Sequence, residues 1–159
     1  MIQVRPLTCA TILVVVLVMS CGCSSSPPKP TPVKAALVTA VDVNPDIEGH
    51  PAPIVVRLYE LKDAGAFNNS DYFRLIDREQ EALGASLVAK EEYELQPGES
   101  RTWDMKVPGE AHFLGVAAGF RDLANSHWKA VLPTPHKGFS TPKLTINVAK
   151  SAVSLKVGK

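Results

Sequence analysis

The sequence has little cysteine: its three thiols, Cys9, Cys21 and Cys23, all lie within the first 23 of 159 residues. A disulfide framework, a thiolate zinc site and a cysteine nucleophile are therefore excluded for everything after Cys23. An excess of one charge is also lacking, because 17 Lys and Arg residues balance 16 Asp and Glu. Domains that bind nucleic acid usually carry a basic stripe that neutralises phosphates, so nucleic acid is not an expected partner.

Aromatic residues make up only 6% of the chain, and the familiar catalytic patterns are missing. There is no G-x-S-x-G elbow, no P-loop and no H-E-x-x-H motif. The histidines show none of the short paired spacings of metal ligands; they are His50, His112, His127 and His136. We interpret Glu91, Glu92 and Glu94 as a solvated acidic patch on a strand. We therefore expect no enzyme, no metal site, no small-molecule substrate and no cofactor other than covalent lipid.

A long hydrophobic run is absent too, since the apolar stretch over residues 7–19 is about a dozen residues and a membrane-spanning helix needs roughly 20. With Arg5 before it, this stretch predicts a signal peptide over residues 1–20. The segment that follows, Val18 to Cys23, resembles the bacterial lipobox, in which an aliphatic and a small residue precede a cysteine. The cysteine thiol forms a thioether to diacylglycerol, and the small residue lets the signal peptidase reach the peptide bond.

Cys21 is the predicted acylation site, because Val18 stands three places upstream, and Cys23 is the second choice. The alternative is an ordinary secretory signal with incidental cysteines. A diacylglycerol and an N-acyl chain on Cys21 would hold the protein stably on a membrane, because two acyl chains already suffice. No aspartate stands directly after either cysteine, so the inner-membrane retention signal of lipoproteins is absent. We expect the outer membrane, with the domain facing the periplasm.

Residues 21–34 contain the acylated cysteine and a Ser- and Pro-rich tether, and residues 35–159 the folded domain. In the domain, apolar residues recur with a period of two, and Pro-Gly and Pro-Thr-Pro turns separate the runs. The run from Phe113 to Phe120 is nearly all apolar, which is typical of a central strand covered on both faces. The pattern predicts an all-β, antiparallel sandwich of seven or eight strands.

A helical insertion is predicted at about residues 66–84, where the strand pattern stops. Asn69 or Ser70 can cap it, Asp71 favours its first turn and Gly84 can end it. The side chains expected to be buried are Phe67, Phe73, Ile76 and Leu83.

From Asn44 onward the chain resembles the type VI secretion system outer-membrane lipoproteins called TssJ, VasD or SciN. The resemblance begins with Asn44-Pro45-Asp46, Gly49 to Pro53 and the run Ile54 to Lys62. It continues through Ala66-Phe67, Asp71-Tyr72-Phe73, Glu91-Glu92, Leu95 to Glu99, Phe120-Arg121-Asp122 and Trp128-Lys129. These motifs are soft one by one and specific in this order, and with the lipobox they cover nearly the whole chain.

The resemblance implies a transthyretin-like β-sandwich with a small helical segment. It also implies a docking role, because family members sit on the inner leaflet of the outer membrane and hold the periplasmic C-terminal domain of TssM. In the family, the loop between the first two strands makes this contact. The partner-binding loop implied here consists of Asn44, Pro45, Asp46, Ile47, Glu48, Gly49, His50, Pro51, Ala52 and Pro53.

The composition of this loop agrees with a binding role without proving it. Its three prolines reduce the conformational entropy lost on docking, and Asp46, Glu48 and His50 give it a polar, mostly acidic tip. A plain surface connection stiffened for stability is the alternative. We expect Arg121 to pair locally and Trp128 to fill the core. A periplasmic small-ligand-binding lipoprotein and a hydrolase accessory or inhibitor lipoprotein are the other hypotheses for the whole chain.

Overall fold

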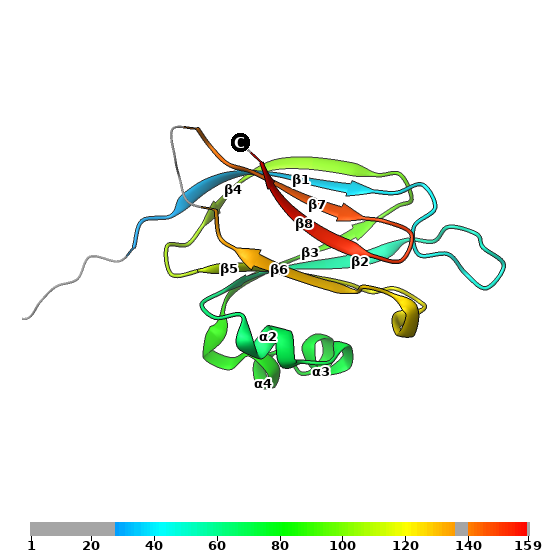
Figure 1. Ribbon diagram of the computed structural model, residues 1–159, viewed down its shortest axis with the longest axis horizontal. Coiled ribbons are helices and arrows are strands. Elements are labelled where there is room, and N and C mark those ends of the chain that lie inside the picture. Colours follow the sequence, from blue (N-terminus) through cyan, green and yellow to red (C-terminus); the bar gives the residue numbers. More distant parts are fainter. Residues whose placement is uncertain (1–27, 136–139, 159) are drawn as a thin grey trace, which may run out of the picture.

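The computed structural model describes residues 28–135 and 140–158, which form two four-stranded sheets packed face to face (Figure 1). One sheet has the order β4-β1-β7-β8, with β4 at Ser100–Val107, β1 at Thr31–Thr39, β7 at Lys143–Val148 and β8 at Val153–Gly158. The other has the order β3-β2-β5-β6, with β3 at Leu87–Leu95, β2 at Ile54–Leu61, β5 at Phe113–Ala118 and β6 at Lys129–Pro133. The predicted β-sandwich of seven or eight strands is confirmed.

The sandwich departs from a purely antiparallel arrangement at one pair, because β1 and β7 run parallel. The other strand pairs are antiparallel. A parallel pair requires a long crossover, and here the chain crosses to the second sheet and back twice between the two strands. Local sequence patterns carry no information about such a distant pairing.

Strand β1 begins earlier than the sequence predicted, since residues 31–34 belong to it and not to the tether. Pro32 is tolerated there for a geometric reason. Lys34 donates its N–H to Pro142, on the side of β7, so the nitrogen of Pro32 faces the same side. The pairing with β7 starts only at Lys34, so the missing N–H of Pro32 removes no hydrogen bond between strands. Cys21, Cys23, the signal peptide and the rest of the tether up to residue 27 lie outside the described residues.

The main core fills the space between the two sheets and follows the predicted alternation of the strands. In β4, for example, Met105 and Val107 are buried and Trp103 is half-buried, whereas Thr102 and Asp104 are exposed. Strand β5 is buried along almost its whole length, as the apolar run from Phe113 predicted. Its second face is covered by the helical insertion.

The insertion, which we call the helical annex, consists of three short helices and a 3-10 turn where the sequence predicted one helix. The helices are α2 at Gly65–Asn69, α3 at Tyr72–Asp77 and α4 at Glu79–Leu83, followed by η1 at Gly84–Ser86. Asp71 starts a new helix by accepting a hydrogen bond from the backbone N–H of Arg74, so it is a cap and not a first-turn residue. Gly84 ends α4 as predicted, with a φ of 49°.

The annex covers the outer face of the β3-β2-β5-β6 sheet (Figure 1), where a second apolar cluster forms. Phe67 and Leu83 are buried there as predicted, and Ile76 is half-buried. Phe73, by contrast, is 65% exposed and does not belong to the cluster; its ring packs edge-on against that of its neighbour Tyr72. Lys129 ties the annex to β6, donating from Nζ to the carbonyls of Phe67, Asn68 and Ser70. Among the described residues, no helix is long and apolar enough to cross a membrane.

Candidate functional site

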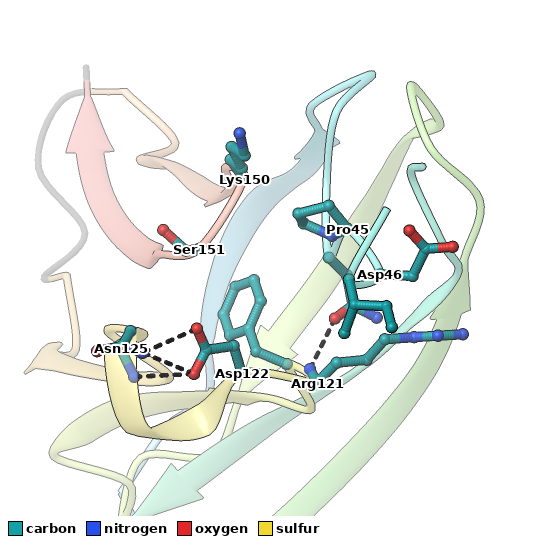
Figure 2. A pocket seen from close by; sticks show the side chains of 10 residues that line it. Pro45, Asp46, Arg121, Asp122, Asn125, Lys150 and Ser151 are labelled. Atoms are coloured by element: carbon teal, nitrogen blue, oxygen red, sulfur yellow. Dashed lines mark hydrogen bonds between the residues drawn. The ribbon is translucent and has the colours of Figure 1, made fainter. Parts of the chain in front are cut away.

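Three loops meet at one end of the sandwich and surround a cleft of about 600 Å³ (Figure 2). They are residues 40–53 between β1 and β2, residues 119–128 between β5 and β6, and residues 149–152 between β7 and β8; we call this surface the three-loop end. The cleft is lined by Asn44, Pro45, Asp46, Ile47, Phe120, Arg121, Asp122, Asn125, Lys150 and Ser151. The predicted binding loop is therefore one wall of a larger composite surface.

Asn44 connects the three loops, and it is buried, with 4% of its surface exposed. Its side-chain Nδ2 donates to the Pro53 carbonyl at 2.8 Å, and its Oδ1 accepts from the Arg121 backbone N–H at 2.8 Å. Its own N–H donates to the Lys150 carbonyl at 3.0 Å. Its φ of 50° is a left-handed conformation that Asn adopts more readily than most residues. Asn44 thus holds the loop in place and presents no side chain to a partner.

The tip of the first loop is shaped by Asp46. Its Oδ1 accepts hydrogen bonds from the backbone N–H groups of Glu48 and His50, both at 2.9 Å. The backbone adds two more hydrogen bonds, in which the Asp46 N–H donates to the His50 carbonyl and the Gly49 N–H donates to the Asp46 carbonyl. The hydrogen bond from His50, more than any other interaction, lowers the pKa of Asp46. Asp46 is therefore occupied in fixing the turn, as Asp side chains commonly are in turns.

The residues presented to solvent by this loop are a smaller set than the ten predicted. Asn44 and Ala52 are buried, and Pro45 and Asp46 are half-buried. The side chain of Ile47 is fully exposed at the tip. The other exposed residues are Glu48, Gly49, His50, Pro51 and Pro53. Val41, earlier in the same loop, is 75% exposed. An exposed isoleucine at the tip of a hydrogen-bonded turn offers a partner an apolar anchor that is already ordered.

Potential metal-ligand atoms of Asp46, Glu48 and His50 lie within 4.8 Å of one another. The hydrogen bonds and ion pairs within the turn account for this closeness: His50 Nδ1 lies 3.4 Å from carboxylate oxygens of both Asp46 and Glu48. The cluster is therefore explained by the folding of the loop itself.

The other two loops contribute residues that sequence reasoning did not assign to the site. Asp122 accepts from the backbone and side-chain nitrogens of Asn125, which closes the turn η2 at Leu123–Asn125 (Figure 2). Arg121 was expected to pair locally, but its side chain is exposed on the cleft and forms no ion pair within the described ranges. Trp128 packs against both apolar clusters, as expected, with its ring 5.3 Å from that of Tyr72.

A composite surface of this kind has no signal in the sequence, because strand topology alone brings residues 44, 121 and 150 together. The one local hint is the cap pattern of Asp122 with Asn125, which predicts a turn but not its neighbours. The described part of the surface holds exposed polar side chains, the exposed aliphatic residues Val41 and Ile47, and no arrangement of nucleophile and base. Its features suit recognition of another protein.

Comparison with known proteins identifies the relatives of this chain. The sequence profile of a family described as "Type VI secretion lipoprotein, VasD, EvfM, TssJ" matches residues 31–152. The solved structure of the lipoprotein TssJ1 from Pseudomonas aeruginosa is 38% identical, with 82% of this chain and 98% of that chain covered and a TM-score of 0.76. A chain of a structure described as "Type VI membrane complex" is 30% identical, with 79% and 98% covered and a TM-score of 0.70.

A chain of the structure described as "T6SS protein TssM C-terminal domain (869-1107) from EAEC" is 28% identical, with 79% and 97% covered and a TM-score of 0.63. None of the curated proteins matches the chain significantly.

Proposed function

The chain belongs to the type VI secretion lipoprotein family, and we propose that it anchors the type VI membrane complex to the outer membrane by binding the periplasmic C-terminal domain of TssM. Membership makes the protein a structural component of the secretion system and not an enzyme. The proposal adds two features to family membership. The anchor is a lipid on Cys21, and the contact surface is the three-loop end, which includes the loop Asn44–Pro53.

The observation that carries the proposal is the placement of the candidate loop relative to the tether. Strand β1 starts at Thr31, where the tether ends, and stops at Thr39, directly before the loop. Nine residues of strand at about 3.3 Å each separate the two by roughly 30 Å. Figure 1 shows the start of β1 at one end of the sandwich and the β1–β2 loop at the other. The lipid attachment and the partner surface would therefore lie at opposite ends of the sandwich and would not obstruct each other.

The three-loop end has the physical features of a protein-binding surface. Its first loop is ordered by the hydrogen bonds of Asn44 and Asp46, so little entropy is lost on docking. Ile47 supplies an exposed apolar anchor, and the neighbouring cleft of about 600 Å³ can accept a side chain from the partner. A chain that this protein covers to 97% occurs in a structure described as the TssM C-terminal domain, which supports TssM as that partner.

The test is calorimetric titration of the mature chain, with Cys21 and Cys23 replaced by Ser, against the periplasmic C-terminal domain of the TssM-like protein from the same organism. We expect saturable binding that Ile47→Ser weakens by about tenfold or more, as expected for loss of a central apolar anchor. The matched control is Val157→Ser, an exposed aliphatic residue on β8 that is 46% exposed. Neither substitution should lower the melting temperature by more than a degree or two.

The outcomes separate the role from its site. Binding that survives Ile47→Ser and Glu48→Ser unchanged would keep the docking role and refute this loop as its site. Equal losses from Ile47→Ser and Val157→Ser would also refute the assignment. No binding by a folded chain would refute the docking role, and the cleft, which has the volume of small-ligand pockets, would then favour a ligand-binding lipoprotein.

A further inference from the structure

The two sheets of the sandwich have different outer faces. The helical annex covers the outer face of β3-β2-β5-β6, whereas the outer face of β4-β1-β7-β8 lies on the opposite side of the molecule from the annex (Figure 1). Side chains on this second face alternate with the buried ones along each strand. They include Lys34, Ala36 and Val38 of β1, Thr102, Asp104 and Lys106 of β4, Lys143 and Thr145 of β7, and Lys156 of β8.

This face, which we call the lysine face, is strongly basic in a chain of almost balanced charge. Four lysines stand on it against one carboxylate, and all four are exposed: Lys34, Lys106, Lys143 and Lys156. The opposite side carries both signs of charge. Its annex and flanks hold Asp63, Asp71, Asp77, Glu79 and Glu81 with Lys62, Arg74 and Arg78, and Arg57, Lys90 and Lys129 reach the annex from the sheet beneath it. The protein therefore has one mainly basic side and one side of mixed charge.

The four lysines are not neutralised within the described part of the fold. None of them lies within 4.0 Å of a carboxylate oxygen there, although Lys62 and Lys90 on the other side each pair with a glutamate at 2.9 Å. Lys34 is the direct partner of Lys143 across the β1–β7 pair and of Asp104 across the β1–β4 pair. Like charges on directly opposed residues of a sheet destabilise it, and Asp104 can offset this for only part of the four lysines. An anionic surface would relieve the remaining repulsion.

The chain that precedes β1 brings a membrane within reach of this face. Nine residues lie between Cys21 and Thr31, and the ten steps from one to the other span at most about 35 Å when fully extended. Strand β1 enters the fold in the sheet that carries the lysine face. The face is also slightly hollowed, with a groove of about 390 Å³ whose lining includes Lys34, Asp104 and Lys143. A lipid held at Cys21 would thus keep anionic headgroups near these lysines.

We infer that the lysine face lies against the anionic phospholipid headgroups of the membrane in which the protein is anchored. The inference rests on the lipid anchor of the proposed function and adds an orientation to it. The sandwich lies flat on the leaflet, the annex faces away from it, and the three-loop end projects sideways, where a partner can reach it. Each lysine near an anionic surface contributes about 1 kcal/mol, or roughly a fivefold change in the docking equilibrium.

The test uses the acylated protein in phosphatidylcholine vesicles with and without phosphatidylglycerol. Lysines are labelled with an amine-reactive reagent and quantified by mass spectrometry. We expect phosphatidylglycerol to reduce labelling of Lys34, Lys106, Lys143 and Lys156 severalfold and to leave Lys62 and Lys90 unchanged. High salt should restore labelling, because it screens the attraction within a few ångströms.

Paired variants sharpen the test. Lys106→Gln with Lys143→Gln should weaken protection of Lys34 and Lys156 by roughly fivefold per lysine removed, whereas Lys62→Gln with Lys90→Gln should not. Association with vesicles but equal labelling in both lipids would overturn the lysine face and leave the anchor intact. Failure to associate with either vesicle would overturn the anchor and the docked face together. Protection by purified peptidoglycan, and not by phosphatidylglycerol, would assign the face to the cell wall and overturn the lipid assignment.

Discussion

Replacing Asn44 with alanine tests how the three-loop end is held together. The substitution removes two side-chain hydrogen bonds, one to the Pro53 carbonyl and one from the Arg121 N–H, each at 2.8 Å. Each contributes about 1 kcal/mol. Alanine must also adopt a φ of 50°, a left-handed conformation that asparagine tolerates and that costs alanine roughly 1–2 kcal/mol. Asn44→Ala should therefore lower the free energy of unfolding by about 3–4 kcal/mol, a large share of the 5–15 kcal/mol typical of a domain.

The variant Asn44→Gly separates the two causes. Glycine adopts positive φ without strain but loses the same hydrogen bonds and is more flexible in the unfolded chain. We expect Asn44→Gly to be more stable than Asn44→Ala by about 1 kcal/mol and less stable than the native chain by about 2–3 kcal/mol. Urea denaturation measures both values, with an unchanged slope showing that compactness is unaffected. A loss below about 1 kcal/mol for Asn44→Ala, or glycine less stable than alanine, would refute the reasoning.

Three further changes test other parts of the structure. Burial, followed by the charge of Glu91, raises the pKa of Glu60 to about 7 from an unfolded value of 4.5, so the folded state holds the proton more tightly. The free energy of unfolding should therefore fall as pH rises from 4.5 to 7 and stay level above pH 7. Glu60→Gln should abolish this pH dependence and raise the free energy of unfolding at pH 8 by up to about 3 kcal/mol. Urea denaturation measures both, and a variant with the same pH profile as the native chain would contradict the assignment. A Cβ on Gly115 would lie 3.0 Å from the ring of Phe67, so Gly115→Val should reduce the melting temperature by more than ten degrees, and a smaller loss would show that the annex shifts freely. Cys21→Ser should abolish palmitate labelling and release the protein from the membrane fraction; labelling that persists would move the anchor to Cys23.

The parts of the fold that local physics determines could be predicted from the sequence. Alternation with period two identified the strands, because it decides which face of a strand is buried. The unbroken apolar run of β5 correctly indicated cover on both faces, which the annex supplies. The position of the annex was predicted correctly, but its division into several short helices was not. The Ser70 hydroxyl donates a hydrogen bond to the Ala66 carbonyl at the end of one helix, and Asp71 caps the start of the next. Residues with strong local bonding options end helices as readily as they start them.

What could not be predicted depends on contacts between distant segments. The resemblance to the family predicted the loop Asn44–Pro53 as a binding site. It did not predict which residues of the loop hold its shape and which are exposed to a partner. Asn44 and Asp46 look like polar surface residues in the sequence, yet one is buried and the other is committed to backbone N–H groups. The partners of Asn44 lie 77 positions away at Arg121 and farther away at Lys150. Only the order of strands in the sheets brings them together, and a single sequence does not reveal that order.

Strand β1 is the element that would bear the mechanical load in the proposed function. The tether leads into β1 at Thr31, and the binding loop follows β1 after Thr39, so tension between membrane and partner would run along this strand. An edge strand under such a load would be held by one neighbour. Strand β1 is internal, bonded to β4 along eight residue pairs and to β7 along six. Hydrogen bonds of an antiparallel pair lie perpendicular to the strand, so a pull along β1 loads them together and not one after another. The parallel pairing with β7, which local patterns could not predict, is what makes β1 internal.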